Sequence, residues 1–276
     1  MKKLTCIIDN TVQRGSSLWG EHGLAFRIEV DQVCALFDTG HSGTVLLHNL
    51  GLLGECPRNA AALILSHAHR DHTGGLVSVL LQKPRLALYA SPDLFRPRFT
   101  LRDGKYKSIG LPLTRMELSQ LADLRLSDTP VEVLPGVWTT GEIGARSEPE
   151  GRSTRHFVPD GNGWQPDPYR DDISLVMETQ KGLVVICGCC HAGLLNTLSH
   201  VRRTFQRRII AVLGGTHLIN ADDACLQHVI ETIQTTYRQA RFYLNHCTGE
   251  RAYVALATAF GDRVQPCPAG TTLIFE

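Results

Sequence analysis

Short apolar runs recur along the chain, and polar or turn-forming stretches separate them. Residues 24–30, LAFRIEV, alternate apolar and polar positions, which is typical of a half-buried strand. Residues 33–40, VCALFDTG, are more continuously apolar, and the two runs predict a hairpin that turns at Asp31 and Gln32. Further strands are predicted at residues 62–66, 85–90, 131–140, 173–179, 182–188, 209–215, 240–246 and 271–275.

Stretches with helical spacing lie between these strands. They predict helices over residues 76–82, 194–205, 221–239 and 252–260. Asp222 and Asp223 fall in the first turn of the third helix, where carboxylates are favourable. Each half of the chain has several strands followed by helix–strand alternation. This pattern predicts an α/β layered architecture, with two sheets face to face and helices outside, in a single domain over residues 1–276.

Two segments fit neither pattern. Ser91–Leu111 is basic and turn-rich, which predicts a surface excursion. Residues 141–171 are dense in glycine, proline and charge, and a loop this long in a compact domain is usually functional or disordered. Both interpretations stay open for it: a flap that covers a site, and a disordered loop.

The composition indicates which binding partners and which cellular compartment to expect. The chain has 28 basic and 27 acidic residues and a net charge of +1, so the basic face that non-specific nucleic-acid binding needs is not evident and nucleic acid is not the expected partner. No secretory leader and no run of about 18 apolar residues is recognisable, so we expect no membrane association. The nine scattered cysteines do not look like a disulfide framework, which favours reduced thiols and a cytoplasmic location.

Histidines concentrate at the ends of predicted strands. The run SHAHRDHTGG directly follows strand 62–66 and holds His67, His69, Asp71 and His72. Three other predicted strand ends deliver His191, His217 and His246. A polar turn after a buried strand is the plain alternative, but it would make the clustering a coincidence. Because histidine is the commonest metal ligand, we expect a metal site on these strand-end loops.

The spacing within HAHRDH does not suit a single ion. His67 and His69 can point to the same side of an extended turn, whereas Asp71 and His72 lie in the next turn and can face a second ion. Two adjacent ions can share a water, lower its pKa toward neutrality and so supply metal-bound hydroxide at pH 7. We therefore expect two divalent transition-metal ions, with zinc first and manganese or iron suited to the same ligands. Asp71 is the ligand best able to accept a proton as well.

The chain resembles the metallo-β-lactamase superfamily. HAHRDH fits the HxHxDH signature of that superfamily, and FDTG at residues 37–40 resembles its first motif. The segments TGEI, GLVVICGCCHAGLLNTL, GGTHL and NHCTG follow the order of one branch. That branch includes the dihydropteroate-synthase-like enzyme of methanopterin biosynthesis and related metal-dependent hydrolases. The resemblance spans residues 21–249 and implies an αββα sandwich of two mixed sheets.

The resemblance also implies a ligand set. One ion would be held by His67, His69 and His191, and the other by Asp71, His72 and His246. Asp38 would orient the HAHRDH loop through hydrogen bonds. His217 is expected to cap, to support a ligand, or to reach a substrate phosphate or a metal. The histidines outside any constellation are expected to be structural or exposed: His41, His48, His156, His200 and His228.

Two positions depart from the pattern of the family. Many members place a bridging aspartate after the strand that here ends in Cys189 and Cys190. A thiolate ligand and a buried neutral thiol both stay open for Cys189, with the neutral thiol favoured. Arg70 stands where the branch often has tyrosine, and it would influence the charge preference for the substrate.

The leading functional hypothesis is a metal-dependent hydrolase that acts on a small anionic ester or phosphoester. Arg70, together with Arg146, Arg152 and Arg155 of segment 141–171, is predicted to meet the anionic group of a small-molecule substrate. The resemblance implies an alternative on the same metal site, a transferase that joins a pterin to an arylamine. A nuclease and a non-enzymatic metal sensor are further alternatives. The oligomeric state is not predictable from these features.

Overall fold

The computed structural model describes residues 1–276. One seven-stranded sheet contains β1 (Lys2–Ile8), β2 (Ala25–Val30), β3 (Val33–Phe37), β4 (Ala60–Ile64), β5 (Leu86–Ala90), β8 (Ala122–Leu126) and β18 (Thr272–Phe275). The second contains β9 (Glu132–Leu134), β10 (Val137–Thr139), β13 (Leu175–Glu178), β14 (Leu183–Cys187), β15 (Ile209–Gly214), β16 (Arg241–Leu244) and β17 (Val264–Pro266). The helices are α1 (Gly43–Leu52), α2 (Arg70–Thr73), α3 (Leu76–Gln82), α4 (Arg115–Leu121), α5 (Leu194–Phe205), α6 (Asp223–Thr236) and α7 (Glu250–Phe260).

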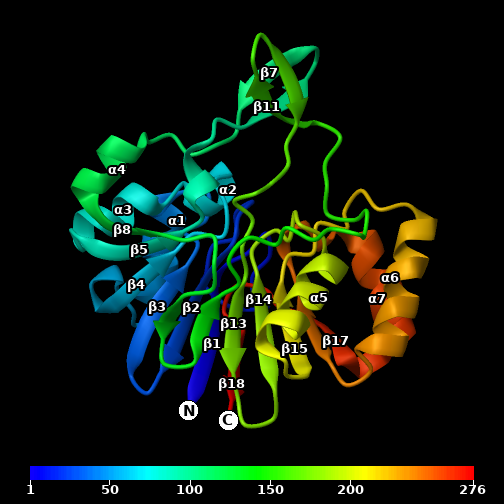
Figure 1. The fold of residues 1–276 in the computed structure, drawn as a ribbon. Helices are drawn as coiled ribbons and strands as arrows, with labels where there is room; N and C mark the ends of the chain where they lie inside the picture. The colour runs from blue at the N-terminus through cyan, green and yellow to red at the C-terminus, as the bar shows by residue number, and fades with distance from the viewer.

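The two sheets pack face to face and carry helices on their outer faces (Figure 1). The strand orders are β18-β1-β2-β3-β4-β5-β8 and β17-β16-β15-β14-β13-β10-β9. Both sheets are mixed, since β2 and β3 are antiparallel while β3, β4, β5 and β8 run parallel, and β13 is antiparallel to the parallel set β14 to β17. The expected αββα sandwich is confirmed.

The apolar pattern of each strand explains which faces it buries. In β2, Phe26 and Ile28 point into the core between the sheets, while Arg27 and Glu29 form an ion pair on the other face. In β14 both faces are apolar: Val184 contributes to the core between the sheets, and the alternate positions pack beneath α5 and α6. A continuous apolar run is therefore required for β14, as parallel strands covered on both faces need.

Most predicted elements are confirmed. The hairpin between β2 and β3 turns at Asp31 and Gln32, whose φ angles of 48° and 72° match the left-handed positions of a type I′ turn. Helices α3 and α5 have the predicted bounds. The pattern missed β1, which begins with two lysines and pairs with β2 and β18, and it missed α1, α4, β8 and β17.

A third sheet stands beyond one end of the sandwich (Figure 1). It is built from β6 (Phe99–Arg102), β7 (Lys105–Ser108), β11 (His156–Asp160) and β12 (Gly163–Pro166), in the order β12-β11-β6-β7. The disordered-loop interpretation does not hold for residues 156–166 of segment 141–171, because they form a hairpin that pairs with the hairpin of residues 99–108. Tyr106 stacks on Trp164 at 3.8 Å between ring centroids, and this contact joins the two hairpins. No helix has the length and apolarity that a bilayer span requires.

Candidate metal centre

The candidate ligands lie on loops that follow parallel strands of both sheets. β4 leads into His67 and His69, β14 into His191, and β16 into His246. His67, His69, His72, His191 and His246 are all at least nine-tenths buried. The carboxyl ends of neighbouring parallel strands meet at one edge of a sheet, which is why residues far apart in the sequence converge here.

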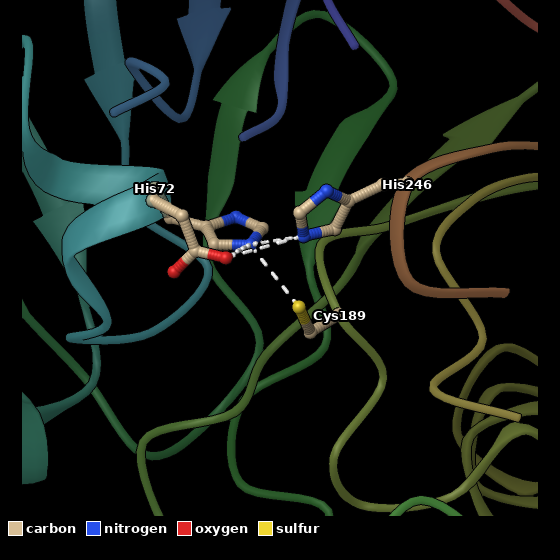
Figure 2. A group of neighbouring side chains, drawn as sticks. His72, Cys189 and His246 are labelled. Carbon is tan, nitrogen blue, oxygen red and sulfur yellow. Dashed lines mark hydrogen bonds and ion pairs between the residues drawn. The ribbon is translucent and has the colours of Figure 1, made fainter. Parts of the chain in front are cut away.

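One group consists of Asp71, His72 and His246. The Nε2 atoms of His72 and His246 face each other at 3.2 Å, and Figure 2 shows the two rings directed toward one another, His72 from α2 and His246 from the segment after β16. Asp71 Oδ2 lies 3.4 Å from His246 Nε2 and 3.8 Å from His72 Nε2. Three potential ligand atoms therefore surround one point.

Hydrogen bonds on the far side of each ring decide where its proton sits. His72 Nδ1 lies 2.6 Å from Asp38 Oδ2, and His246 Nδ1 lies 3.1 Å from Asn10 Oδ1. Both oxygens act as acceptors, so each Nδ1 carries the proton and each Nε2 presents a lone pair. Burial acts to lower the pKa of His72, but Asp38 and Asp71 raise it above its ordinary value, so a proton also suits the space between the two Nε2 atoms until a metal ion replaces it. The pair of rings is therefore arranged for a metal ion.

The same logic applies to His67. Ser66 Oγ donates to Asp38 Oδ2 at 2.7 Å and so accepts from His67 Nδ1 at 2.8 Å. His67 Nε2 is then a lone pair that is fully buried and has no hydrogen-bond partner. A buried polar atom without a partner is costly, so a ligand is the natural explanation for it.

His191 and His69 complete the second group. His191 Nδ1 lies 3.3 Å from the carbonyl oxygen of Gly151, which again places the proton on Nδ1. His191 Nε2 faces His69 Nδ1 at 3.2 Å. His191 shares one group of ligand atoms with His67 and Cys189 and another with His69 and His156, so it links the two groups.

The donor set fits transition-metal ions. Three groups have ligand atoms within 4.8 Å of one another: Asp71 with His72, Cys189 and His246; His67 with Cys189 and His191; and His69 with His156 and His191. Imidazole and thiolate donors suit zinc, iron or manganese better than calcium or magnesium, which prefer all-oxygen sites.

Electrostatics keep the ligands in their binding forms. Burial lowers the pKa of His67, His69 and His191 well below the ordinary histidine value, so these rings are neutral. Burial acts to raise the pKa of Asp71, but the neighbouring His72 and His246 outweigh it and hold that pKa well below its usual range. Metal ligands must be deprotonated, and these four groups already are. His72 differs, because Asp38 and Asp71 outweigh the effect of burial and raise its pKa, so this ring would lose a proton on binding an ion.

Asp38 organises the HAHRDH loop from below. It sits directly after β3 with φ at 62°, and its carboxylate is fully buried. Oδ1 accepts from the Ser66 backbone N–H at 2.7 Å, while Oδ2 accepts from the Ser66 hydroxyl and from His72 Nδ1. One carboxylate thus fixes both ends of the loop that carries the first four predicted ligands.

Two buried aspartates that the sequence analysis missed hold the other ligand loops. Asp171 Oδ2 accepts from the Ala68 N–H at 2.8 Å, and Asp172 Oδ2 accepts from the Ala192 N–H at 2.8 Å. Burial raises the pKa of Asp171 to about 7 and that of Asp172 to about 6. The only signal in the sequence was their position directly before a predicted strand.

His156 was expected to be structural or exposed, and the structure places it beside the centre instead. It opens β11 of the third sheet, and its ring centroid lies 5.0 Å from that of His69 and 5.8 Å from that of His191. Burial lowers the pKa of His156 to about 4. No local pattern predicted this, because the pairing of β11 with the distant β6 determines its position.

The remaining predicted site residues differ in burial and in their contacts with the ligands. Cys189 is 3% exposed and belongs to two of the three ligand groups. The His217 ring lies tilted against that of His191 at 4.3 Å between centroids, its Nδ1 has no partner, and burial lowers its pKa to about 4. Arg70 is exposed at the start of α2 and forms no ion pair. Arg146 donates three hydrogen bonds to backbone carbonyls, so its guanidinium holds segment 141–171 together and is not free to bind an anion.

An αββα sandwich that gathers histidine, aspartate and cysteine donors into adjacent groups at one edge defines a class of layered α/β metalloproteins. The chain belongs to the metallo-beta-lactamase superfamily, whose family model matches residues 18–168. The family resemblance found in the sequence motifs is therefore confirmed.

Named relatives refine this placement. The chain is 28% identical over 290 residues to 7,8-dihydropterin-6-methyl-4-(beta-D-ribofuranosyl)-aminobenzene-5'-phosphate synthase of Methanocaldococcus jannaschii, covering 99% of this chain and 96% of the relative. It is 26% identical to exodeoxyribonuclease WalJ of Streptococcus pneumoniae, covering 86% of this chain and 82% of that protein. Among solved structures, the metal-dependent hydrolase Tm1679 of the beta-lactamase superfamily is 26% identical, with a TM-score of 0.83 and 100% of both chains covered.

Proposed function

We propose that this protein is a cytoplasmic enzyme that hydrolyses a small anionic ester or phosphoester with two divalent transition-metal ions, zinc foremost. The observation that carries the proposal is the set of converging ring nitrogens. His72 and His246 face each other through Nε2 while both Nδ1 atoms are engaged elsewhere, and the His67 lone pair is buried without a partner. His67, His69 and His191 would hold one ion, and Asp71, His72 and His246 the other.

Ions bound there would lower the pKa of a coordinated water and polarise a substrate oxygen. Asp71 is the proposed proton acceptor, because its side chain is 17% exposed, whereas the His72 and His246 side chains are fully buried. Only Oδ2 of Asp71 faces the histidines, which leaves Oδ1 to take a proton from the attacking water. His22 Nε2 lies 3.3 Å from the same carboxylate, at the exposed rim of the site.

The position of Arg152 favours an anionic substrate. It is exposed, and it lines a pocket of about 450 Å³ together with His217. The His217 ring in turn contacts the His191 ring, so the pocket leads toward the ligands. A guanidinium placed there would bind a phosphate or carboxylate through charge-assisted hydrogen bonds. In this proposal, Arg152 takes the role that the sequence analysis shared among several arginines.

The flap expected over the site becomes, in this proposal, the third sheet with the segment that leads into it. Deleting that segment would not be a clean test, because Glu150 accepts from the Leu195 N–H at the start of α5 and Gly151 contacts His191. Trp164→Ala is a sharper change. It removes the stack with Tyr106 that joins the two hairpins, and it leaves every proposed ligand in place.

A transferase that joins a pterin to an arylamine is the second candidate. The relative from Methanocaldococcus jannaschii, whose name describes such a synthase, covers almost the whole chain. An open cleft of about 700 Å³ beside His246 is lined by Ile219, Tyr253 and Val254, and an apolar surface of this kind suits a planar ring. The nuclease alternative has less support, because the net charge is only +1.

Metal analysis combined with a substrate panel tests the proposal. We expect two ions per chain, and turnover of a phosphoester, thioester or lactone that is lost on chelation and restored by the metal. Arg152→Ala should raise KM for an anionic substrate about tenfold, since a hydrogen bond to a charged group contributes about 1.5 kcal/mol or more. Arg170→Ala is the matched control, because Arg170 is 59% exposed and pairs with Glu142.

Two results would decide against hydrolysis. Condensation of a hydroxymethylpterin diphosphate with an arylamine, in a preparation that hydrolyses none of the panel, would favour the transferase. A chain that binds no transition metal in either assay would exclude both enzyme proposals.

A further inference from the structure

We propose that the Cys189 thiolate is a ligand shared by the two ion sites, in the place where many superfamily members carry a bridging aspartate. This inference rests on the proposed metal centre and adds a sulfur donor to it. Sequence reasoning favoured a neutral, buried thiol at this position.

The Cys189 sulfur lies between the two groups of ligand atoms. Cys189 Sγ lies 3.1 Å from His72 Nε2, and Figure 2 shows the sulfur directed at the space between His72 and His246. The same sulfur also groups with the ligand atoms of His67 and His191 on the other side. Cys189 is the only side chain that joins a ligand group of one proposed ion site to a ligand group of the other.

The surroundings of the Cys189 sulfur are polar. A cysteine that serves only as packing is surrounded by aliphatic side chains, but the groups around Cys189 Sγ are imidazole nitrogens, the Asp71 carboxylate and the Cys247 thiol. His72 Nε2 presents a lone pair to the sulfur, so without a metal the Cys189 S–H donates to that nitrogen. On metal binding the S–H proton leaves to the solvent and a sulfur–metal bond replaces it.

The neighbouring cysteines are oriented differently. Cys187 is the last residue of β14, and its side chain packs in the core beneath the outer helices. Cys190 turns back toward α5, where its Sγ lies 3.3 Å from Thr197 Oγ1. Among the three thiols of the CGCC run, only the middle one faces the ligands.

The backbone around Cys189 leaves it little freedom to turn away. A Cβ on the preceding Gly188 would lie 2.2 Å from Ser66 Oγ, so this strand end packs directly against the HAHRDH loop. On the other side, Cys247 Sγ donates to the Cys189 carbonyl at 3.4 Å. The close packing fixes the sulfur at the junction of the two groups.

Cobalt substitution provides a readout that does not depend on activity. The full-length protein is stripped with a chelator and reloaded with Co²⁺, and its near-ultraviolet spectrum is recorded for sulfur-to-cobalt charge transfer. We expect this band in the unmodified protein, in Cys190→Ala and in Cys247→Ser. It should be absent in Cys189→Ser, which should also retain fewer than two cobalt ions per chain.

Cys189→Asp guards against a folding defect. This variant supplies the carboxylate of other family members, so it should bind two cobalt ions and lack the band. A protein that binds cobalt without a charge-transfer band overturns the role of Cys189 and leaves the histidine site standing. A band that persists unchanged in Cys189→Ser or Cys189→Asp also overturns it, and a chain that binds no cobalt overturns both this inference and the proposed function.

Discussion

Replacing Arg98 with methionine should destabilise the protein strongly and empty the metal centre, although Arg98 is not a ligand. Arg98 is 1% exposed and is the largest fully buried side chain of the protein. Its Nη2 lies 2.7 Å from both Asp93 Oδ2 and Asp171 Oδ1, and its Nε lies 3.1 Å from Asp167 Oδ2. Methionine is also long and unbranched, so Arg98→Met keeps much of the packing while it removes the charge.

The magnitude follows from what the substitution leaves behind. The side chains of Asp167 and Asp171 are 0% and 1% exposed, so neither carboxylate can turn to water once the guanidinium is gone. Removing one partner of a buried ion pair costs about 3–5 kcal/mol. The whole free energy of unfolding of a natural domain is about 5–15 kcal/mol, so Arg98→Met should be marginally folded.

The loss should depend on pH in a defined direction. Burial raises the pKa of Asp171 from 3.8 to about 7 although Arg98 opposes the rise, so removing Arg98 raises this pKa further. An acid with a raised pKa in the folded state stabilises fully below its unfolded value and loses that contribution as the pH rises through the folded value. The deficit of Arg98→Met should therefore be larger at about pH 8 than at about pH 5, where Asp171 is protonated in both proteins.

Urea unfolding at about pH 5 and about pH 8 measures both quantities. Arg125→Met is the control, because that arginine is 52% exposed and pairs with Asp123 at 48% exposure, so its loss should change stability by about 0.5 kcal/mol or less. Metal content is measured on the same samples, since Asp171 holds the Ala68 N–H between two proposed ligands. Equal, small losses in both variants at the higher pH would refute the reasoning.

Three further predictions follow from the site. His69→Ala and Asp71→Ala should each lower metal content, measured by elemental analysis, and turnover, measured by an activity assay. Full metal retention in a variant that lacks both His67 and His72 would contradict the ligand assignment. All nine cysteines should react with an alkylating agent after denaturation without reductant, since each is free in the structure, and a stoichiometric disulfide found by mass spectrometry would argue against the cytoplasmic assignment. Chelation should leave the near-ultraviolet circular dichroism native-like and lower the unfolding temperature, because ligand binding adds stability only by mass action; collapse of that spectrum would mean that the ions hold the fold.

The layers could be predicted from sequence because the pattern that buries a strand is local. Alternation in residues 24–30 and the continuous run in residues 182–188 each specify which faces are covered, and the structure agrees. The strand β1 was missed because its first two residues are lysines, and only its pairing with β2 and β18 makes it a strand. Information about such pairing is not local to the segment.

The residues of the candidate site also divide into those that a local motif predicts and those that long-range contacts place. His67, His69 and His72 could be predicted because they share one short motif, and the other strand ends converge on them once the strands are known to be parallel. His156 could not, since the pairing of β11 with β6 across more than fifty residues decides where it lies. The role of Asp171 could not be predicted either, because it depends on an ion pair with Arg98, which lies far from Asp171 in the sequence.

The hydrogen bonds around the centre show why this fold can keep so many donors in one small space. Four buried aspartates each accept from a backbone N–H at or beside a proposed ligand: Asp9 from His246, Asp38 from Ser66, Asp171 from Ala68, and Asp172 from Ala192. These bonds fix the main chain of the ligand loops through contacts that involve no metal ion. The Nδ1 contacts orient the rings, which directs Nε2 of His67, His72, His191 and His246 into the centre. Such preorganisation would favour metal binding, because the ligand atoms already converge before an ion arrives.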